Sequence, residues 1–203
     1  MAINVPKNIM LHCSASPDHP NKVDRADIII IHVEINGWDD GGYHRYIEDT
    51  DGDGNFEILT GRAITTPGAH CPDQGMNFKS IGICFIGGDP WTGFGPAYPM
   101  PQKQWDAGVK LCAELCKEYQ IPVENIWCHR DFNKGKTCPG IGFDRDLFRA
   151  EVAAMLAAKP APPVETGSGK ANEPHPVNQL IQNALAAQGR ADTAWKELLE
   201  VWK

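Results

Sequence analysis

The chain has 203 residues, of which 42% are hydrophobic and 22% charged, a composition typical of a globular protein. Its formal net charge is −7, so it lacks the excess of basic residues that marks a nucleic-acid-binding protein. No run approaches the roughly 20 apolar residues of a membrane helix. The N-terminus, MAINVPKNIMLHC, has no basic region followed by a long apolar core, so we expect synthesis in the cytoplasm without a signal peptide.

Seven cysteines are present, and their spacing does not form a disulfide framework. This usage predicts a protein made in a reducing compartment. Cys71 and Cys128 are the two candidates for a pairing. Four others lie in strand-like or helix-like apolar runs and are predicted to be core thiols: Cys13, Cys84, Cys112 and Cys116.

The first predicted elements are a buried strand over residues 8–13, with His12 near its end, and an ambiguous segment over residues 24–37. Four consecutive isoleucines in that segment favour a strand. A capping residue, Asp24, and a terminating glycine, Gly37, favour a helix instead, as does the helical spacing of Ile28, Ile31 and Ile35. His32 lies in this segment without an obvious ligand partner, and we interpret it as a structural histidine.

A hairpin is predicted next, with strands over residues 43–48 and 56–60 around the acidic stretch DTDGDGN. Three aspartates and a glycine match positions 1, 3, 5 and 6 of a calcium-binding loop: Asp49, Asp51, Asp53 and Gly54. The twelfth position is Thr60, where that loop requires a bidentate glutamate. We therefore interpret the stretch as a glycine-rich hairpin turn.

Two irregular loops flank a central strand. Residues 66–77 form a loop rich in Gly and Pro, and residues 80–86 are a near-continuous apolar run, which predicts a strand in the middle of a sheet. The second loop, over residues 87–101, carries three aromatic residues without periodicity: Trp91, Phe94 and Tyr98. These either line a groove for sugar or peptide or pack on one another within the loop.

The second half predicts a helix from Pro101 to Pro122, a short strand at Ile126 and a last core helix over residues 144–158. The last helix places five apolar residues on one side: Leu147, Phe148, Val152, Met155 and Leu156. Alternating strands and helices indicate an α/β fold, with a single mixed central sheet and helices on both faces.

Beyond this domain of residues 1–158, the composition predicts a flexible linker over 159–176 and an amphipathic helical tail over 177–203. The tail has two apolar stripes, the second with Trp195 and Trp202, and its charges sum to zero. We expect it to mediate self-association or docking to an envelope or virion partner rather than to anchor the chain in a membrane.

The stretch WCHRDFNKGKTCPG, residues 127–140, carries the clearest chemistry. His129 follows a short β-like run, and Cys138 lies in a loop nine residues later, so the two are candidate zinc ligands. Alone they are better explained as a buried histidine and an inert thiol, because a zinc site needs a third protein ligand. His12, far upstream, is the candidate for that position.

Together these segments resemble the zinc-dependent N-acetylmuramoyl-L-alanine amidases, the family shared by phage endolysins and animal peptidoglycan recognition proteins. The matching segments, spread over residues 8–157, are HCSAS, the GW-x-D stretch with GYH, a G-x-H loop at Gly68–His70, N-x-x-SIGIC-x-IGG from Asn77 to Gly88, and CHRD with K-x-CPG. The resemblance implies a helix over residues 24–37. It also implies cleavage of the amide between N-acetylmuramic acid and L-alanine, on the cell wall, after the enzyme is released or delivered.

The resemblance also implies the site. His12, His129 and Cys138 are the expected Zn²⁺ ligands, with a zinc-activated water in the fourth position. Lys136 is expected to stabilise the oxyanion rather than to be a solvated loop lysine. Tyr43 is expected to orient the water or relay its proton rather than only to pack.

Three further residues have weaker assignments. His70 and Asn77 are expected to line the peptide groove, and His44 to support the site or to be structural. Three other functions stay open: a zinc amidase acting on another acylated peptide, a non-catalytic peptidoglycan-binding module, and a regulatory phage protein. The non-catalytic members of the family lack the zinc cysteine, so the presence of Cys138 favours an enzyme.

Overall fold

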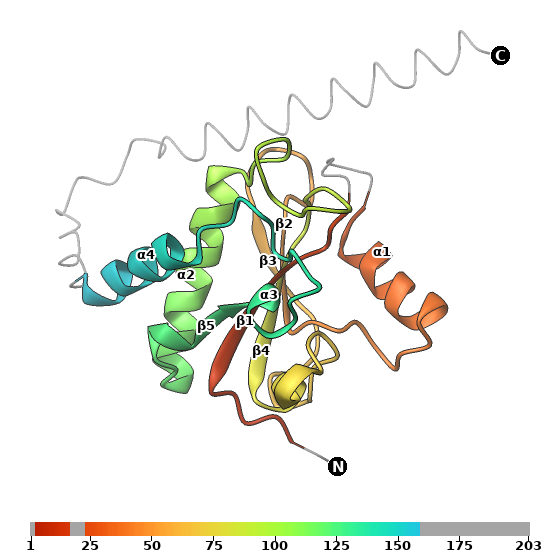
Figure 1. Cartoon of the computed structure of the whole chain (residues 1–203), viewed down its shortest axis with the longest axis horizontal. Helices are drawn as coiled ribbons and strands as arrows, with labels where there is room; N and C mark the ends of the chain where they lie inside the picture. The colour runs from red at the N-terminus through yellow and green to blue at the C-terminus, as the bar shows by residue number, and fades with distance from the viewer. Residues whose placement is uncertain (1–2, 17–22, 159–203) are drawn as a thin grey trace, which may run out of the picture. The chain divides into compact units, whose positions relative to one another are not determined.

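The fold is built on one five-stranded sheet (Figure 1). A computed structural model of the chain describes residues 3–16 and 23–158. The strands lie in the order β3-β2-β4-β1-β5. Their bounds are β1 Asn8–Cys13, β2 Arg45–Glu48, β3 Glu57–Thr60, β4 Ser80–Phe85 and β5 Ile126–Cys128.

The sheet is mixed, as the sequence predicts. The two central strands, β1 and β4, are parallel, and β5 and β2 add in parallel on either side. Only the edge strand β3 is antiparallel, because it returns from β2 through the acidic hairpin. All six residues of β4 are buried, which explains its near-continuous apolar sequence.

One face of the sheet carries the main core. Alternate residues of β1 and β4, such as Leu11 and Ile83, point towards helices α2 (Gln102–Tyr119) and α4 (Arg145–Ala157). Helix α2 packs closely on the sheet because it has a glycine, Gly108, at the contact. A Cβ atom there would lie 2.5 Å from the ring of Phe85.

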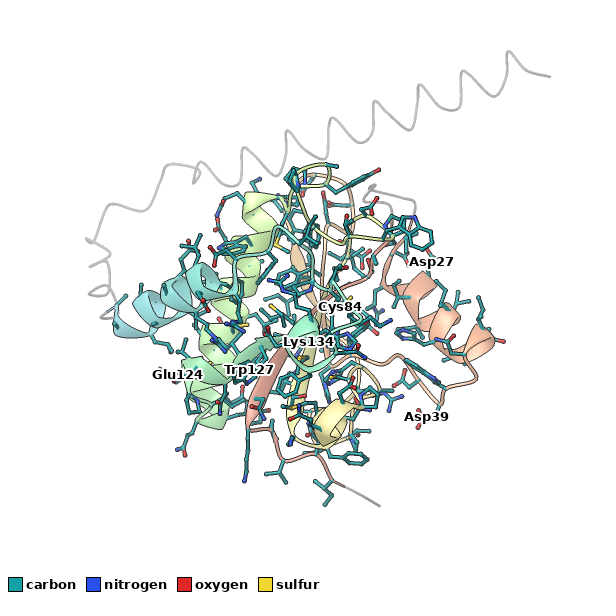
Figure 2. All side chains as sticks on the ribbon, viewed as in Figure 1. Asp27, Asp39, Cys84, Glu124, Trp127 and Lys134 are labelled. Carbon is teal, nitrogen blue, oxygen red and sulfur yellow. The ribbon has the colours of Figure 1, made fainter. Side chains whose placement is uncertain are left out.

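The opposite face is covered in part by helix α1 (Arg25–Ile30), which continues as a π-helical turn over Ile31–Ile35. This confirms the helix over the strand alternative for the run of isoleucines. The N-terminus of α1 has a capping box, in which the Asp24 side chain accepts from the backbone N–H of Asp27 and the Asp27 side chain accepts from that of Asp24. Ile28 packs against the sheet beside Cys84, which Figure 2 shows near the centre of the fold.

Helices α1 and α4 bury fewer apolar residues than the spacing of these residues in the sequence suggests. In α1 only Ile28 is buried, whereas Ile31 and Ile35 are exposed. In α4 the buried residues are Phe148 and Val152, and the expectation that Leu147, Met155 and Leu156 join them is wrong, since all three are exposed. Each helix contacts the fold along a single line of residues about one turn apart, so its flanking apolar residues face solvent.

The remaining short elements are 3₁₀ helices over Asp73–Phe78 and Val123–Asn125 and the helix α3 over His129–Phe132. In the acidic hairpin turn, aspartate side chains accept from backbone N–H groups, for example Asp49 from Gly54 and Asp53 from Asn55. None of the described helices has the length and apolar character that crossing a membrane requires. The predicted linker 159–176 and tail 177–203 lie outside the described residues, so that division of the chain stays a prediction.

Candidate functional site

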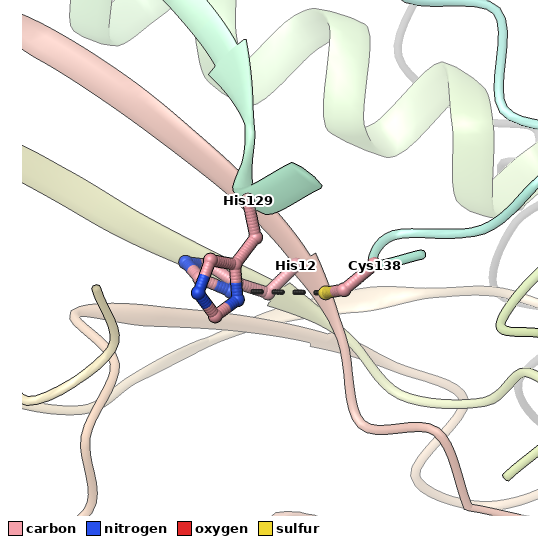
Figure 3. Close-up of side chains that lie close together, drawn as sticks. All are labelled: His12, His129 and Cys138. Carbon is pink, nitrogen blue, oxygen red and sulfur yellow. Dashed lines mark hydrogen bonds between the residues drawn. The ribbon is translucent and has the colours of Figure 1, made fainter. Parts of the chain in front are cut away.

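Three side chains that could hold a metal converge at the ends of two neighbouring strands (Figure 3). His12 lies on β1, on the face opposite the main core, because its neighbours Leu11 and Cys13 point into that core. His129 begins α3 directly after β5, and Leu11 of β1 pairs with Cys128 of β5. This register places the two histidines side by side although 116 residues separate them in the sequence.

The third member, Cys138, approaches from the loop after α3. The donor atoms of His12, His129 and Cys138 all lie within 4.8 Å of one another. The distance from His12 Nδ1 to Cys138 Sγ is 3.8 Å. A tetrahedral zinc ion, with bonds of about 2.0 Å to nitrogen and about 2.3 Å to sulfur, would hold these two atoms about 3.6 Å apart. The donor set and its spacing therefore fit zinc with little movement.

Cys138 is held in place through its backbone and its sulfur. The backbone N–H of Cys13 donates to Cys138 Sγ at 3.2 Å, and the N–H of Arg130 donates to the carbonyl of Cys138 at 3.1 Å. Burial raises the pKa of the Cys138 thiol well above its ordinary value. A thiolate here therefore needs a cation beside it, which a metal ion supplies.

His12 is fixed in orientation by a second histidine. His12 Nε2 lies 3.1 Å from His70 Nδ1, so the hydrogen bond to His70 leaves His12 Nδ1 facing Cys138. Burial lowers the pKa of His12 well below its ordinary value, with further contributions from His70 and His129. His12 is thus a neutral imidazole near neutral pH, which is the form that binds metals.

His70 is buried in a narrow space between two glycines rather than exposed at the surface. A Cβ atom at Gly68 or Gly82 would lie 2.3 or 2.4 Å from the Cδ2 atom of His70. The side-chain oxygen of Asn77 accepts from the backbone N–H groups of His70 and Cys71. These contacts place His70 and Asn77 behind His12, and neither residue lines the pocket described below. Their expected contact with the peptide stays a prediction.

The triad opens into a pocket of about 500 Å³. Tyr43 and Lys136, the two predicted catalytic residues, both line it, together with His129 and Cys138. The ring centroids of Tyr43 and His12 are 5.0 Å apart. Burial, followed by nearby cysteines, raises the pKa of Tyr43 well above its ordinary value, so its hydroxyl is a hydrogen-bond donor near neutral pH.

Lys136 stands in an exposed turn that Asn133 organises. The carbonyl of Asn133 accepts from the N–H of Lys136 at 3.1 Å, and its side-chain oxygen accepts from the N–H of Gly135 at 3.0 Å. The pKa of His129 is lowered first by burial and then by the charge of Lys136. The ammonium group is thus close enough to the triad to influence charge that develops there.

Sequence reasoning missed several residues of the pocket. Cys13 is buried in the main core, as predicted, and it also lines the pocket, where its sulfur lies 4.0 Å from that of Cys138. Its position directly after His12 was the available signal. Six other residues complete the lining without having been singled out for the site: Ser14, Ala15, Pro90, Gly93, Gly135 and Thr137. Trp91, one of the three loop aromatics considered as groove residues, also lines it.

The other histidines and cysteines near the site have structural contacts. His44 is fully buried, and its Nδ1 accepts from the backbone N–H of Gly82 while its Nε2 donates to the carbonyl of Thr66. His32 accepts from the N–H of Gly42, as expected for a structural histidine. Cys71 and Cys128 are buried free thiols, so the candidate pairing does not form. Cys71 lies instead beside Asp73, within 4.8 Å of a His129 nitrogen.

Comparisons with known proteins identify the family. A family model described as N-acetylmuramoyl-L-alanine amidase matches residues 3–141. The endolysin of Enterobacteria phage T3 is 40% identical over 137 residues, which cover 68% of this chain and 82% of the endolysin.

Solved structures give the same family. The N-acetylmuramoyl-L-alanine amidase LysC from Clostridium intestinale is 26% identical with a TM-score of 0.60, and the match covers 75% of this chain and 91% of LysC. Drosophila PGRP-LB is 30% identical with a TM-score of 0.53, over 69% of this chain and 78% of that protein.

Proposed function

The chain belongs to the N-acetylmuramoyl-L-alanine amidase family, and from that membership we propose a specific site for the reaction. It is an endolysin-type peptidoglycan amidase, and its proposed zinc ligands are His12, His129 and Cys138. One observation carries this assignment. The three donor atoms lie within 4.8 Å of one another, and two of the three residues line the pocket that holds Tyr43 and Lys136.

Zinc at this position would lower the pKa of a water molecule towards about 7 and polarise the carbonyl of the scissile amide. Three protein ligands would leave a fourth position for water or substrate, as in catalytic rather than structural zinc sites. The neutral imidazole of His12 and the buried sulfur of Cys138 suit this role, because each offers a free electron pair to a metal ion.

Lys136 and Tyr43 supply the remaining groups. The ammonium group of Lys136 would stabilise the negative charge that develops on the carbonyl oxygen as water adds to the amide. The protonated hydroxyl of Tyr43 donates a hydrogen bond, so we assign it to orient the attacking water rather than to remove its proton.

The reaction can be tested on a defined muropeptide, such as N-acetylglucosaminyl-N-acetylmuramyl tetrapeptide. We expect the purified enzyme to contain about one zinc per chain and to release the free disaccharide and a peptide with an L-alanine N-terminus. Removing the metal with a chelator should abolish cleavage. Zinc should restore it, whereas magnesium should not, because magnesium prefers oxygen ligands.

Mass spectrometry of the products identifies the bond that is cut. Release of a truncated peptide or of a monosaccharide would exclude the amidase reaction. A folded, zinc-loaded protein that binds the muropeptide without cutting it would instead indicate a non-catalytic binding module.

His70 is proposed as a positioning residue for His12. We expect His70→Ala to weaken zinc binding by about 10–100-fold, as is usual when the hydrogen-bond partner of a ligating histidine is lost. His70→Asn keeps an acceptor near the position of Nδ1 and should recover much of the affinity. Competition with a chromophoric chelator measures this affinity without relying on turnover.

A matched control is His32→Asn, which changes another histidine that contacts no proposed ligand. It should leave zinc affinity unchanged. If His70→Ala binds zinc as tightly as the wild type, the hydrogen bond does not position His12, and the expected contact of His70 with the peptide becomes the stronger explanation.

Peptidoglycan is the substrate, and the enzyme acts on the cell wall. We propose that the chain is made in the cytoplasm and reaches the wall on release. The expected self-association or docking through residues 177–203 stays a prediction about a segment outside the described residues.

A further inference from the structure

Trp91 is the most exposed large hydrophobic side chain among the described residues, at 86% of its surface. It also lines the pocket that contains Lys136 and two of the proposed zinc ligands, His129 and Cys138. The two other aromatic residues of the same loop behave differently. Phe94 is buried in the main core, and Tyr98 is partly exposed but does not line the pocket.

The indole is exposed, but the backbone that carries it is fixed. The side chain of Asp89 accepts from the N–H groups of Trp91 and Thr92, each at 2.9 Å. The hydroxyl of Thr137 donates to the carbonyl of Trp91 at 3.2 Å. Because Thr137 lies between Lys136 and Cys138, this bond ties the tryptophan directly to the loop that carries both site residues.

The Trp91 loop is joined to the Cys138 loop at further points. The N–H of Phe94 donates to the carbonyl of Pro139 at 3.0 Å, and Gly93 pairs with Gly140 in an isolated β-bridge. A Cβ atom at Gly93 would lie 2.6 Å from the carbonyl oxygen of Pro139, so the two backbones need this glycine to approach. The backbone of Trp91 is thus fixed beside the Cys138 loop, while its ring is exposed to solvent.

The chemistry of this side of the pocket favours a sugar over a peptide. Pro90, Trp91 and Gly93 contribute no charged group to the lining. The stem peptide of peptidoglycan carries carboxylates and amides, which need ionic or hydrogen-bonding partners. A pyranose ring has a face of C–H groups that packs on an indole, and its hydroxyls stay in water.

We propose that Trp91 is a platform for the sugar next to the scissile amide, so that the enzyme prefers glycan-linked stems over sugar-free peptides. This inference rests on the proposed amidase function. The scissile amide joins the lactyl group of N-acetylmuramic acid to L-alanine, so a sugar on Trp91 fixes the amide over the triad from its glycan side.

Two substrates with the same stem peptide test the proposal. One is the disaccharide tetrapeptide, and the other is the D-lactoyl tetrapeptide, which keeps the scissile amide but lacks the sugar ring. Trp91→Ala should lower kcat/KM for the first by about tenfold, mainly through KM, and leave the second within about twofold of wild type. Trp91→Phe keeps an aromatic face and should recover most of the loss.

Tyr98→Ala is the matched control, because it removes an aromatic ring from the same loop outside the pocket. It should leave both substrates unchanged. Equal losses on both substrates with Trp91→Ala, or no loss on the disaccharide substrate, would overturn the proposal. Unchanged zinc content and thermal unfolding in each variant exclude a folding defect.

A binding measurement separates this inference from the amidase function itself. Saturation-transfer NMR with a peptide-free GlcNAc–MurNAc oligosaccharide should show contact in the wild type and a clear loss in Trp91→Ala. If the wild type cuts neither substrate but this contact depends on Trp91, the amidase proposal fails and the sugar platform stands. If cleavage is normal and the contact is independent of Trp91, only the platform fails.

Discussion

Cys138→Ser is expected to lose nearly all activity, by more than about 10³-fold, since losing even an outer partner of a zinc ligand costs about 10–100-fold. A neutral hydroxyl is a much weaker zinc ligand than a thiolate. The loss should appear as absent zinc in elemental analysis and absent turnover on the disaccharide tetrapeptide.

Cys138→Asp sharpens this test because it keeps a negatively charged ligand. A carboxylate oxygen is an established zinc ligand, so this variant should regain part of the zinc and part of the activity. Wild-type turnover in Cys138→Ser at equal zinc occupancy would show that Cys138 is not a ligand.

The second large effect is expected from Lys136→Ala. Zinc should remain bound, because Lys136 is not a ligand, while kcat should fall by about 10²–10³-fold through the loss of one oxyanion donor. Lys136→Arg keeps the positive charge and should retain part of the activity. Steady-state kinetics together with zinc analysis separate these outcomes.

Lys134 is the matched control for Lys136, since it is also exposed and lies two residues earlier in the same loop. Its ammonium group reaches the carbonyl of Arg130 and does not line the pocket. Lys134→Ala should therefore leave kcat unchanged. If Lys136→Ala loses zinc and regains full activity when excess zinc is added, the role of Lys136 is structural.

Much of the fold follows from local patterns in the sequence. The eighteen-residue helix α2 has a long period of apolar residues, and it ends where Gln120 takes a left-handed conformation shortly before Pro122. Strand β4 is apolar along its whole length because both of its faces are covered. In both α2 and β4, the pattern of apolar residues and the local propensity of the sequence predict the same type of secondary structure.

The width of a buried stripe was harder to predict. Periodicity places Ile28 and Ile31 on similar sides of α1, but burial also depends on how far the helix lies over the sheet. The aromatic loop shows the same limit. The spacing of Trp91, Phe94 and Tyr98 does not tell which of them is buried and which lines the pocket. Their positions depend on the β-bridge between this loop and the Cys138 loop.

The candidate site could be predicted from the sequence because two of its residues lie at the ends of predicted strands. His12 and His129 come at or near the ends of predicted strands, and parallel strands bring their carboxyl ends together. The contact between His12 and His70 could not be predicted, because it depends on the space that Gly68 and Gly82 leave for the second ring. The structure therefore adds a contact with a proposed ligand to the role predicted for His70.

Strand β1 has a consequence for insertions and deletions. Its odd-numbered residues, such as Leu11, enter the main core, and its even-numbered residues, such as His12, face the other side. One residue added within the strand would exchange these two sets, turning the imidazole into the apolar layer and a leucine towards the proposed metal site. A length change between Asn8 and Cys13 is therefore more damaging than the loss of a single core contact. The alternation of side chains along β1 thus determines both the core packing and the position of His12, so a shift by one residue would disrupt both.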